Sequence, residues 1–349
     1  LAEPTMVKNL LKEELNISVV YVLSMGGTIS GSVQEGEVSG GNKIILKSLL
    51  TPELENQHIR FESVTTGHLL SEEIQPEDWA ALIHAISNRI NSGTATGIVV
   101  THGTDTLSYT APLIYWLFAD AGVPIVFTAS NTPPRPLPLK RQPDEARQNL
   151  ARAITLAQKK TNGVYVVFGD RILSPLNLKF LRPTTVGFTN WNASGEPVFT
   201  GSGLLCGETE TDPYVMERLL SDAANHMHLC RIFPGIRADR LLSLTDCGVS
   251  FFFLELYEKG TANMKESPYS LKEFLTKGRK KGCTFFCTSQ QEGVVDFSGY
   301  STSRRMWREG AIPMGSLTTE SAIALYYAAS LVCDTQEELE KTMEIAGQN

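Results

Sequence analysis

The sequence predicts an α/β fold in which helices cover both faces of a parallel sheet. Short apolar segments rich in β-branched residues alternate with longer amphipathic segments along most of the 349-residue chain. Several of the apolar segments stop abruptly at glycine or polar residues, which is typical of strand ends. With 42% hydrophobic and 20% charged residues, the chain has the composition of a globular protein and is long enough for two domains.

The first expected domain spans residues 16–195 and contains five strands and three helices. Its first strand is apolar and ends at Gly26 and Gly27, and its first helix begins with acidic residues after Pro76, which complements the helix dipole. A proline-rich segment at 131–143 predicts a surface loop. The expected strands lie at 17–23, 59–65, 97–100, 124–128 and 164–168, and the helices at 76–90, 107–121 and 144–160.

The second expected domain spans residues 226–349 and repeats the alternation more briefly. A segment rich in Gly, Ser, Asn and Glu at 190–213 marks the end of the first domain, so we expect a linker at 196–225. The expected strands of the second domain lie at 229–233, 248–254 and 284–289, and its helices at 270–280 and 319–333.

Charge and cysteine content narrow the classes of function. The net charge of −7 disfavours a nucleic-acid partner, and no apolar stretch has the length needed to cross a membrane. The first residues lack the charged-then-apolar plan of a signal peptide, so we expect a cytoplasmic protein. The six cysteines are scattered and fit no zinc spacing, and the histidines are dispersed, so we expect no metal site.

Two strand ends each deliver a threonine directly after a glycine. The first strand leads into Gly27-Thr28, and the third leads into Gly103-Thr104-Asp105. Threonine is a weak nucleophile unless a partner accepts its proton, and Lys179 is placed in the chain to supply one. Each feature alone is more often a cap, a turn or a solvated lysine, whereas together at the strand ends of one sheet they indicate a catalytic crevice.

The same segments resemble the two signature blocks of the L-asparaginases. The matching residues are Gly26-Gly27-Thr28-Ile29 and His102-Gly103-Thr104-Asp105-Thr106, and the likeness is closest to the cytosolic type I branch. Weaker similarities at 71–79, at 254–257 with Asn263, and at 317–322 extend it over nearly the whole chain.

The resemblance implies an asparaginase-like two-domain fold, with a larger N-terminal flavodoxin-like parallel sheet and a smaller C-terminal α/β domain. It also implies a homodimer or homotetramer that hydrolyses L-asparagine to L-aspartate and ammonia through an acyl-enzyme, with a small-molecule amide as substrate and no metal or organic cofactor. These are expectations carried by the motifs.

The site residues follow from the resemblance position by position. Thr28 matches the nucleophile, and Thr104, Asp105 and Lys179 match a second catalytic set. Substrate-binding positions are expected at Gly27, Ser71, Glu72, Gly103 and Asn263. Ser71 and the catalytic-set residue Asp105 match residues that hold the substrate's α-carboxylate and α-amino groups, and Asn263 matches a residue that reaches the partner's site. The backbone N–H groups beside Gly27 and Gly103 are candidates for an oxyanion hole.

The chain departs from the family pattern around the expected pocket. Val38 stands where the family has a tyrosine on a mobile loop, so Glu35 or Glu37 would have to replace its hydroxyl. Met25 replaces a small residue before Gly26-Gly27, and the family's Gly-Ser-Gln-x-Pro block has become the longer segment 129–145. Glu258 replaces the glycine after Tyr257, with two residues inserted before Asn263.

These departures leave alternatives to L-asparagine hydrolysis open. One is an amidase of the same fold that acts on a different amide, and another is a catalytically impaired member that binds an amino acid. A third is the amidotransferase subunit that acts on transfer RNA, which shares the fold. The acidic net charge and the expected lack of an extra N-terminal domain disfavour this third possibility.

Overall fold

The computed structural model describes most of the chain, and the described residues group into two compact units. Within the described residues, the first unit holds those up to Pro175, in Phe180–Phe188 and in Val198–Tyr214, and the second holds those in Leu176–Lys179, Thr189–Pro197 and Val215–Asn349. The described residues are 19–34, 37–39, 43–65, 69–135, 144–160, 162–181, 187–191, 204 and 212–348.

The first unit is built on a six-stranded sheet with the strand order β4-β1-β5-β6-β7-β8. The first five of these strands pair in parallel, and β8 is antiparallel to β7. Numbered along the chain, the parallel strands follow the 2-1-3-4-5 order of flavodoxin-like sheets, as expected from the sequence. The strands are β1 (Val19–Ser24), β4 (Ile59–Ser63), β5 (Ala95–Thr101), β6 (Ile125–Thr128), β7 (Val164–Phe168) and β8 (Arg171–Leu173).

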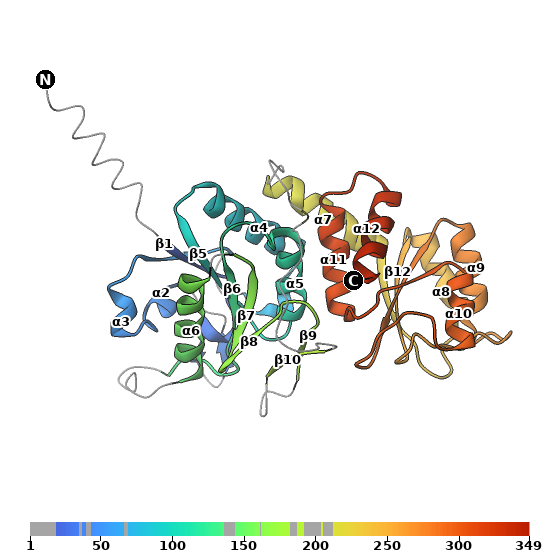
Figure 1. Cartoon of the computed structure of the whole chain (residues 1–349), viewed down its shortest axis with the longest axis horizontal. Coiled ribbons are helices and arrows are strands. Elements are labelled where there is room, and N and C mark those ends of the chain that lie inside the picture. The colour runs from blue at the N-terminus through green and yellow to red at the C-terminus, as the bar shows by residue number, and fades with distance from the viewer. Residues whose placement is uncertain are drawn as a thin grey trace, which may run out of the picture. The chain divides into compact units, whose positions relative to one another are not determined.

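Helices cover both faces of this sheet (Figure 1). Side chains alternate along a strand, so Val20 and Val22 of β1 pack with Leu150 and Ile154 of α6 on one face. Helices α4 and α5 lie on the other side, and every residue of β1 is buried. The helices of this unit are α2 (Lys43–Lys47), α3 (Pro52–Glu55), α4 (Pro76–Asn91), α5 (Leu107–Phe118) and α6 (Glu145–Lys159).

Two small antiparallel pairs accompany the main sheet. Strand β2 (Ser32–Gln34) pairs with β3 (Glu37–Ser39) in the segment after the first threonine motif. Strand β9 (Leu178–Phe180), which carries Lys179, pairs with β10 (Phe188–Asn190).

The second unit has a four-stranded parallel sheet in the order β11-β12-β13-β14. Its elements in chain order are α7 (Pro213–His226), of which the first two residues fall in the first unit, β11 (Met227–Arg231), α8 (Ala238–Leu241), β12 (Phe251–Leu256), α9 (Leu271–Lys280), β13 (Thr284–Ser289), α10 (Ser301–Arg308), β14 (Ala311–Pro313), α11 (Thr319–Ser330) and α12 (Gln336–Gln348).

Helices α7, α8, α10 and α12 and strand β14 were not predicted. Helix α7 occupies residues 213–225 of the segment expected to be a linker, and it buries Met216, Leu220 and Ala223 at helical spacing. This helical pattern follows directly on a stretch rich in Gly and Ser. The composition of that stretch predicted a linker for the whole segment. Strand β14 has only three residues, too few to show an alternating pattern.

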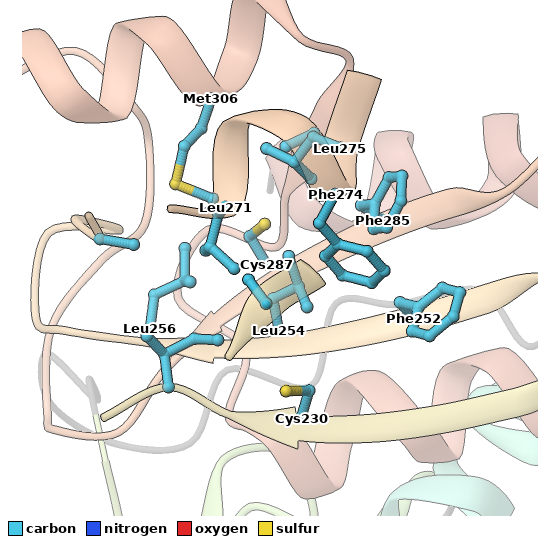
Figure 2. Close-up of a cluster of buried hydrophobic side chains, with 14 of the residues drawn as sticks. Cys230, Phe252, Leu254, Leu256, Leu271, Phe274, Leu275, Phe285, Cys287 and Met306 are labelled. Carbon is cyan, nitrogen blue, oxygen red and sulfur yellow. The ribbon is translucent and has the colours of Figure 1, made fainter. Parts of the chain in front are cut away.

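An aromatic cluster joins α9 to the sheet of the second unit. Figure 2 shows Leu271, Phe274 and Leu275 directed from α9 toward strands β12 and β13. The ring of Phe274 lies 5.0 Å from that of Phe252 and 5.1 Å from that of Phe285, both edge-to-face. All three rings are fully buried, so this cluster is the core that holds the helix on the sheet.

Replacing Phe274 by alanine should lower the free energy of unfolding by about 3–5 kcal/mol, because the change leaves a cavity among close-packed rings. Urea denaturation of the full chain, followed by circular dichroism, measures the effect. Tyr214→Ala is the control, since that ring is 80% exposed and its loss should change stability by less than about 0.5 kcal/mol. Equal losses in both variants would contradict the packing described.

Candidate active site

Thr28 and Thr104 lie just beyond the carboxyl ends of two adjacent parallel strands. Strands β1 and β5 pair in register as far as Ser24 and Thr101, and the Met25 N–H then donates to the Thr101 carbonyl at 3.0 Å. The chain passes from β1 to β4 on one side and then to β5 on the other. This is the topological switch point of the sheet, where open α/β folds bind ligands.

Glycines allow the two turns to meet backbone against backbone. The φ angle of Gly27 is +76°, and a Cβ atom on it would lie 2.5 Å from the amide nitrogen of Gly103. A Cβ atom on Gly103 would in turn collide with the hydroxyl of Ser71. A side chain at Gly27 would push the two turns apart, and one at Gly103 would displace Ser71, so this arrangement requires glycine in both motifs.

The two turns and the segment at 70–72 surround a cavity of about 180 Å³. It is smaller than the roughly 300–1,000 Å³ of pockets for drug-sized ligands, and it fits a molecule of about the size of one amino acid. Leu70 is the one lining residue that the sequence did not single out, and no motif marks it. The cavity is lined by Gly27, Thr28, Leu70, Ser71, Glu72, Gly103, Thr104 and Asp105.

Local hydrogen bonds hold the polar side chains of this cavity in place. The buried Ser71 begins a short 3-10 turn, and its carbonyl accepts a hydrogen bond from the Thr106 hydroxyl at 2.8 Å. Thr28 begins another such turn, which Ser30 secures by donating its hydroxyl to the Gly26 carbonyl at 3.0 Å. The carboxylates of Glu72 and Asp105 are solvent-exposed at the mouth, so the cavity presents hydroxyl groups within and negative charge at its rim.

The neutral side chain of His102 supports the turn that carries Gly103 and Thr104. It is fully buried, its Nδ1 lies 2.8 Å from the Gly103 carbonyl, and its Nε2 lies 3.0 Å from the Thr110 hydroxyl. Trp79 donates its indole N–H to the same hydroxyl at 3.0 Å. Burial lowers the pKa of His102 from 6.5 to about 4, because desolvation disfavours the charged ring. A neutral ring donates from Nδ1 to the Gly103 carbonyl, which steadies the backbone of the second threonine motif.

Lys179 is held within the second unit by an ion pair with Glu320. The ammonium lies 2.6 Å from the Oε1 atom of Glu320, both side chains are only 16% exposed, and the Trp191 ring stands 4.8 Å from the ammonium. Helix α11 begins one residue before Glu320. The sequence did not assign Glu320 a role, because an acidic residue in the first turn of a helix is commonplace.

Asn177 ties the lysine segment to the start of α11 at two further points. Its backbone N–H donates to the Ser321 hydroxyl at 2.9 Å, and its side-chain Oδ1 accepts from the Thr318 N–H at 3.0 Å. Its φ angle is +58°, a left-handed conformation that asparagine tolerates better than most residues. The segment that carries Lys179 is therefore anchored on α11 through both its backbone and its side chains.

Asn263 is exposed and makes local hydrogen bonds in the second unit. Its Oδ1 accepts from the Lys265 N–H at 3.0 Å, and its Nδ2 donates to the Tyr269 carbonyl at 3.2 Å. The structure places it in the loop before α9. Its expected contact with a partner's site stays a prediction.

The structure describes parts of two segments that depart from the family pattern, and both belong to the first unit. Val38 lies in β3, opposite Val33 of β2, whereas Glu35 and the side chain of Glu37 lie outside the described residues. Glu145, at the start of α6, ends the lengthened segment 129–145. Its carboxylate accepts from the backbone N–H and the side-chain Nδ2 of Asn131, both at 3.1 Å. Glu145 thus ties the segment after β6 to helix α6.

Residues 19–193, about half of the chain, match the family model "Asparaginase, N-terminal". The chain belongs to the asparaginase family. This confirms the resemblance found in the two threonine motifs, and it makes the protein an enzyme of a family of amidohydrolases.

Similarity to known members extends over nearly the full length. The chain is 28% identical to the L-asparaginase of Thermococcus kodakarensis, over 94% of this chain and 98% of that protein. The solved structure of the thermostable L-asparaginase from Thermococcus kodakarensis superposes with a TM-score of 0.75 at 26% identity, again over 94% and 98% of the two chains. The chain is also 26% identical to a glutamyl-tRNA(Gln) amidotransferase subunit of Pyrococcus abyssi, over 73% of this chain and 58% of that protein.

Within the described ranges, no three His, Cys, Asp or Glu side chains are grouped so that they would hold a metal ion. None of the helices in the described part of the chain is long and apolar enough to cross a membrane.

The buried His102 should make stability depend on pH. Its pKa is depressed in the folded state, so the unfolded chain binds the proton more readily, and the stabilisation is complete above pH 6.5. As the pH falls from about 6.5 toward 4, up to about 3 kcal/mol should be lost. Urea titrations at pH 7 and pH 5 should show about 2 kcal/mol of this loss in the wild type and a smaller loss in His102→Gln. The same pH dependence in both proteins would exclude His102 as its source.

Glu320→Gln should lower the free energy of unfolding by about 1–3 kcal/mol, because it leaves the largely enclosed Lys179 ammonium without its carboxylate. Thermal and urea unfolding measure the loss. Glu273→Gln on α9 is the matched control, since Glu273 pairs with Lys277 at an exposed position and its loss should change stability by less than about 0.5 kcal/mol. Equal losses in the two variants would contradict the larger contribution expected from the enclosed ion pair.

Proposed function

We propose that this protein hydrolyses L-asparagine to L-aspartate and ammonia, with Thr28 as the nucleophile. The observation that supports this most is the single small cavity at the ends of β1 and β5, which Thr28, Ser71, Thr104 and Asp105 line together. Relatives that carry the name L-asparaginase match nearly the whole chain.

The polar groups of the cavity suit the two ends of an amino acid. The Asp105 carboxylate at the mouth suits the α-ammonium group of the substrate, with Glu72 adding negative charge beside it. The Ser71 hydroxyl is a donor for the α-carboxylate. With the amino acid held at both ends, its side-chain amide would be directed toward the hydroxyls of Thr28 and Thr104.

In the proposed reaction, the Thr28 Oγ1 atom bonds to the amide carbon, and the carbon–nitrogen bond then breaks. The leaving nitrogen takes a proton and departs as ammonia, and water hydrolyses the resulting acyl-enzyme ester. The Gly27 N–H already donates to the Leu69 carbonyl at 3.0 Å. We therefore assign the oxyanion to the neighbouring amides of Thr28 and Thr104. By resemblance to the family, Thr104 and Lys179 transfer the protons.

The oligomeric state and the cellular compartment are proposed on separate grounds. Following the family resemblance, we propose a homodimer or homotetramer in which Asn263 reaches the site of a partner subunit. The scattered cysteines of the sequence favour a cytoplasmic protein.

A different acceptor for the released ammonia is the second candidate. The similarity to the glutamyl-tRNA(Gln) amidotransferase subunit of Pyrococcus abyssi supports a member of the family that releases ammonia for transfer to another substrate. The replacement of tyrosine by Val38 supports, in turn, a preference for an amide other than asparagine.

Thr28→Ala should reduce ammonia release from L-asparagine by roughly a thousandfold or more, because the acyl-enzyme cannot form without the hydroxyl. Thr28→Ser keeps a hydroxyl at the same place and should retain measurable turnover. Ammonia release is measured from L-asparagine, D-asparagine and L-glutamine with the wild type and both variants.

The other candidate functions give different results in the same assay. Equal turnover in the wild type and Thr28→Ala would reject Thr28 as the nucleophile. A preference for L-glutamine or D-asparagine would assign the cavity to another amide. Thermal stabilisation by L-aspartate without turnover would indicate a binding protein, and salt-dependent binding of transfer RNA would favour the amidotransferase reading of the fold.

A further inference from the structure

The second unit contains a wider hollow whose lining is mainly cationic. Its volume is about 560 Å³, and three elements contribute to it: the loop before α9, the first turn of α9, and the C-terminal half of α10 with the residue after it. It contains none of the residues of the threonine cavity. The lining residues are Met264, Lys265, Glu266, Lys272, Arg305, Arg308 and Glu309.

Helix α10 directs two arginines into this hollow. Ser303 and Met306 are fully buried, and Figure 2 shows Met306 reaching from the helix toward Leu271 in the core. Because this buried side fixes the rotation of the helix, Arg305 and Arg308, one turn apart, both line the hollow. Arg304 is exposed on the same helix and does not line it.

The positive charges of the hollow exceed the negative charges. Glu266 is paired with Lys272 at 3.3 Å, and the Glu309 carboxylate accepts a hydrogen bond from the Thr276 hydroxyl at 2.7 Å. Among the residues that the structure describes, no ion pair engages Lys265, Arg305 or Arg308. Like charges one helical turn apart repel each other, and an anion between them would remove that repulsion.

Hydrogen bonds fix the loop that forms one wall of the hollow. The buried Met264 forms part of the lining, and the loop that carries it is closed by the Leu271 N–H, which donates to the Asn263 carbonyl at 2.9 Å. Asn263 also accepts from the Lys265 N–H, which places Lys265 at the rim. The backbone of this loop is therefore fixed before an anion binds, and the exposed side chains of Lys265, Arg305 and Arg308 are what binding has to order.

We propose that this hollow binds a small molecule through a phosphate or pyrophosphate group. Arginine forks form paired hydrogen bonds to phosphate oxygens, and two of them stand here beside Lys265 and beside Lys272, which is itself paired with Glu266. The number of cationic groups exceeds what one carboxylate would need. This site is separate from the proposed amide hydrolysis and does not depend on it.

Isothermal titration calorimetry of the full chain with inorganic pyrophosphate, at low ionic strength, tests the proposal. We expect saturable binding that Arg305→Gln and Arg308→Gln each weaken roughly tenfold. Arg304→Gln is the matched control, because it removes the same charge from the same helix outside the hollow. It should weaken binding by less than about twofold.

Lys265→Gln on the loop provides a second probe that leaves α10 intact, and circular dichroism checks the folding of each variant. It should also weaken pyrophosphate binding. Absence of saturable binding, or equal weakening by Arg304→Gln, would overturn the site. Citrate that binds as tightly as pyrophosphate would overturn its assignment to phosphate groups.

Discussion

The contact between the turns after β1 and β5 is the constraint on which the threonine cavity depends. Parallel pairing brings the carboxyl ends of the two strands to the same edge, and the Gly27 and Gly103 backbones then meet with no room for a side chain. Thr28 and Thr104 are the next residues along each turn, so their separation follows from backbone geometry. The buried, neutral His102 supports one turn by its bond to the Gly103 carbonyl. Rigid backbone, more than side-chain packing, places the hydroxyls.

This dependence explains why the cavity was predictable from sequence. Strand β1 and the segment 98–100 of β5 are buried and almost wholly apolar, glycines follow shortly after both strands, and parallel strands bring their ends to one edge. Residues attached directly to those ends, Thr28 and Thr104 with Asp105, come together once the fold is known. Ser71 required the family resemblance as well, because its place against Gly103 arises from a loop far along the chain.

Features that depend on side chains from distant segments were not predictable. Lys179 and Glu320 are 141 residues apart, and neither position has a local pattern that indicates its partner. Glu145 likewise occupies an ordinary first-turn position of a helix, and only the structure shows that Asn131 binds it. Helix α7 has a clear amphipathic period, but the composition of the preceding segment suggested a linker. Periodicity reports which face of an element is buried, and it carries no information on what covers that face.

Strand β9 shows that the two units are not consecutive pieces of the chain. Leu178 and Lys179 belong to the second unit, whereas Phe180 of the same strand belongs to the first, and the chain enters the second unit again later. No single cut of the polypeptide would therefore release either unit whole. Exchange of the C-terminal half between two such proteins by recombination at one point would leave Lys179 behind with foreign partners. Lys179 and Glu320 stay together in such an exchange only if both of their segments come from the same parent protein.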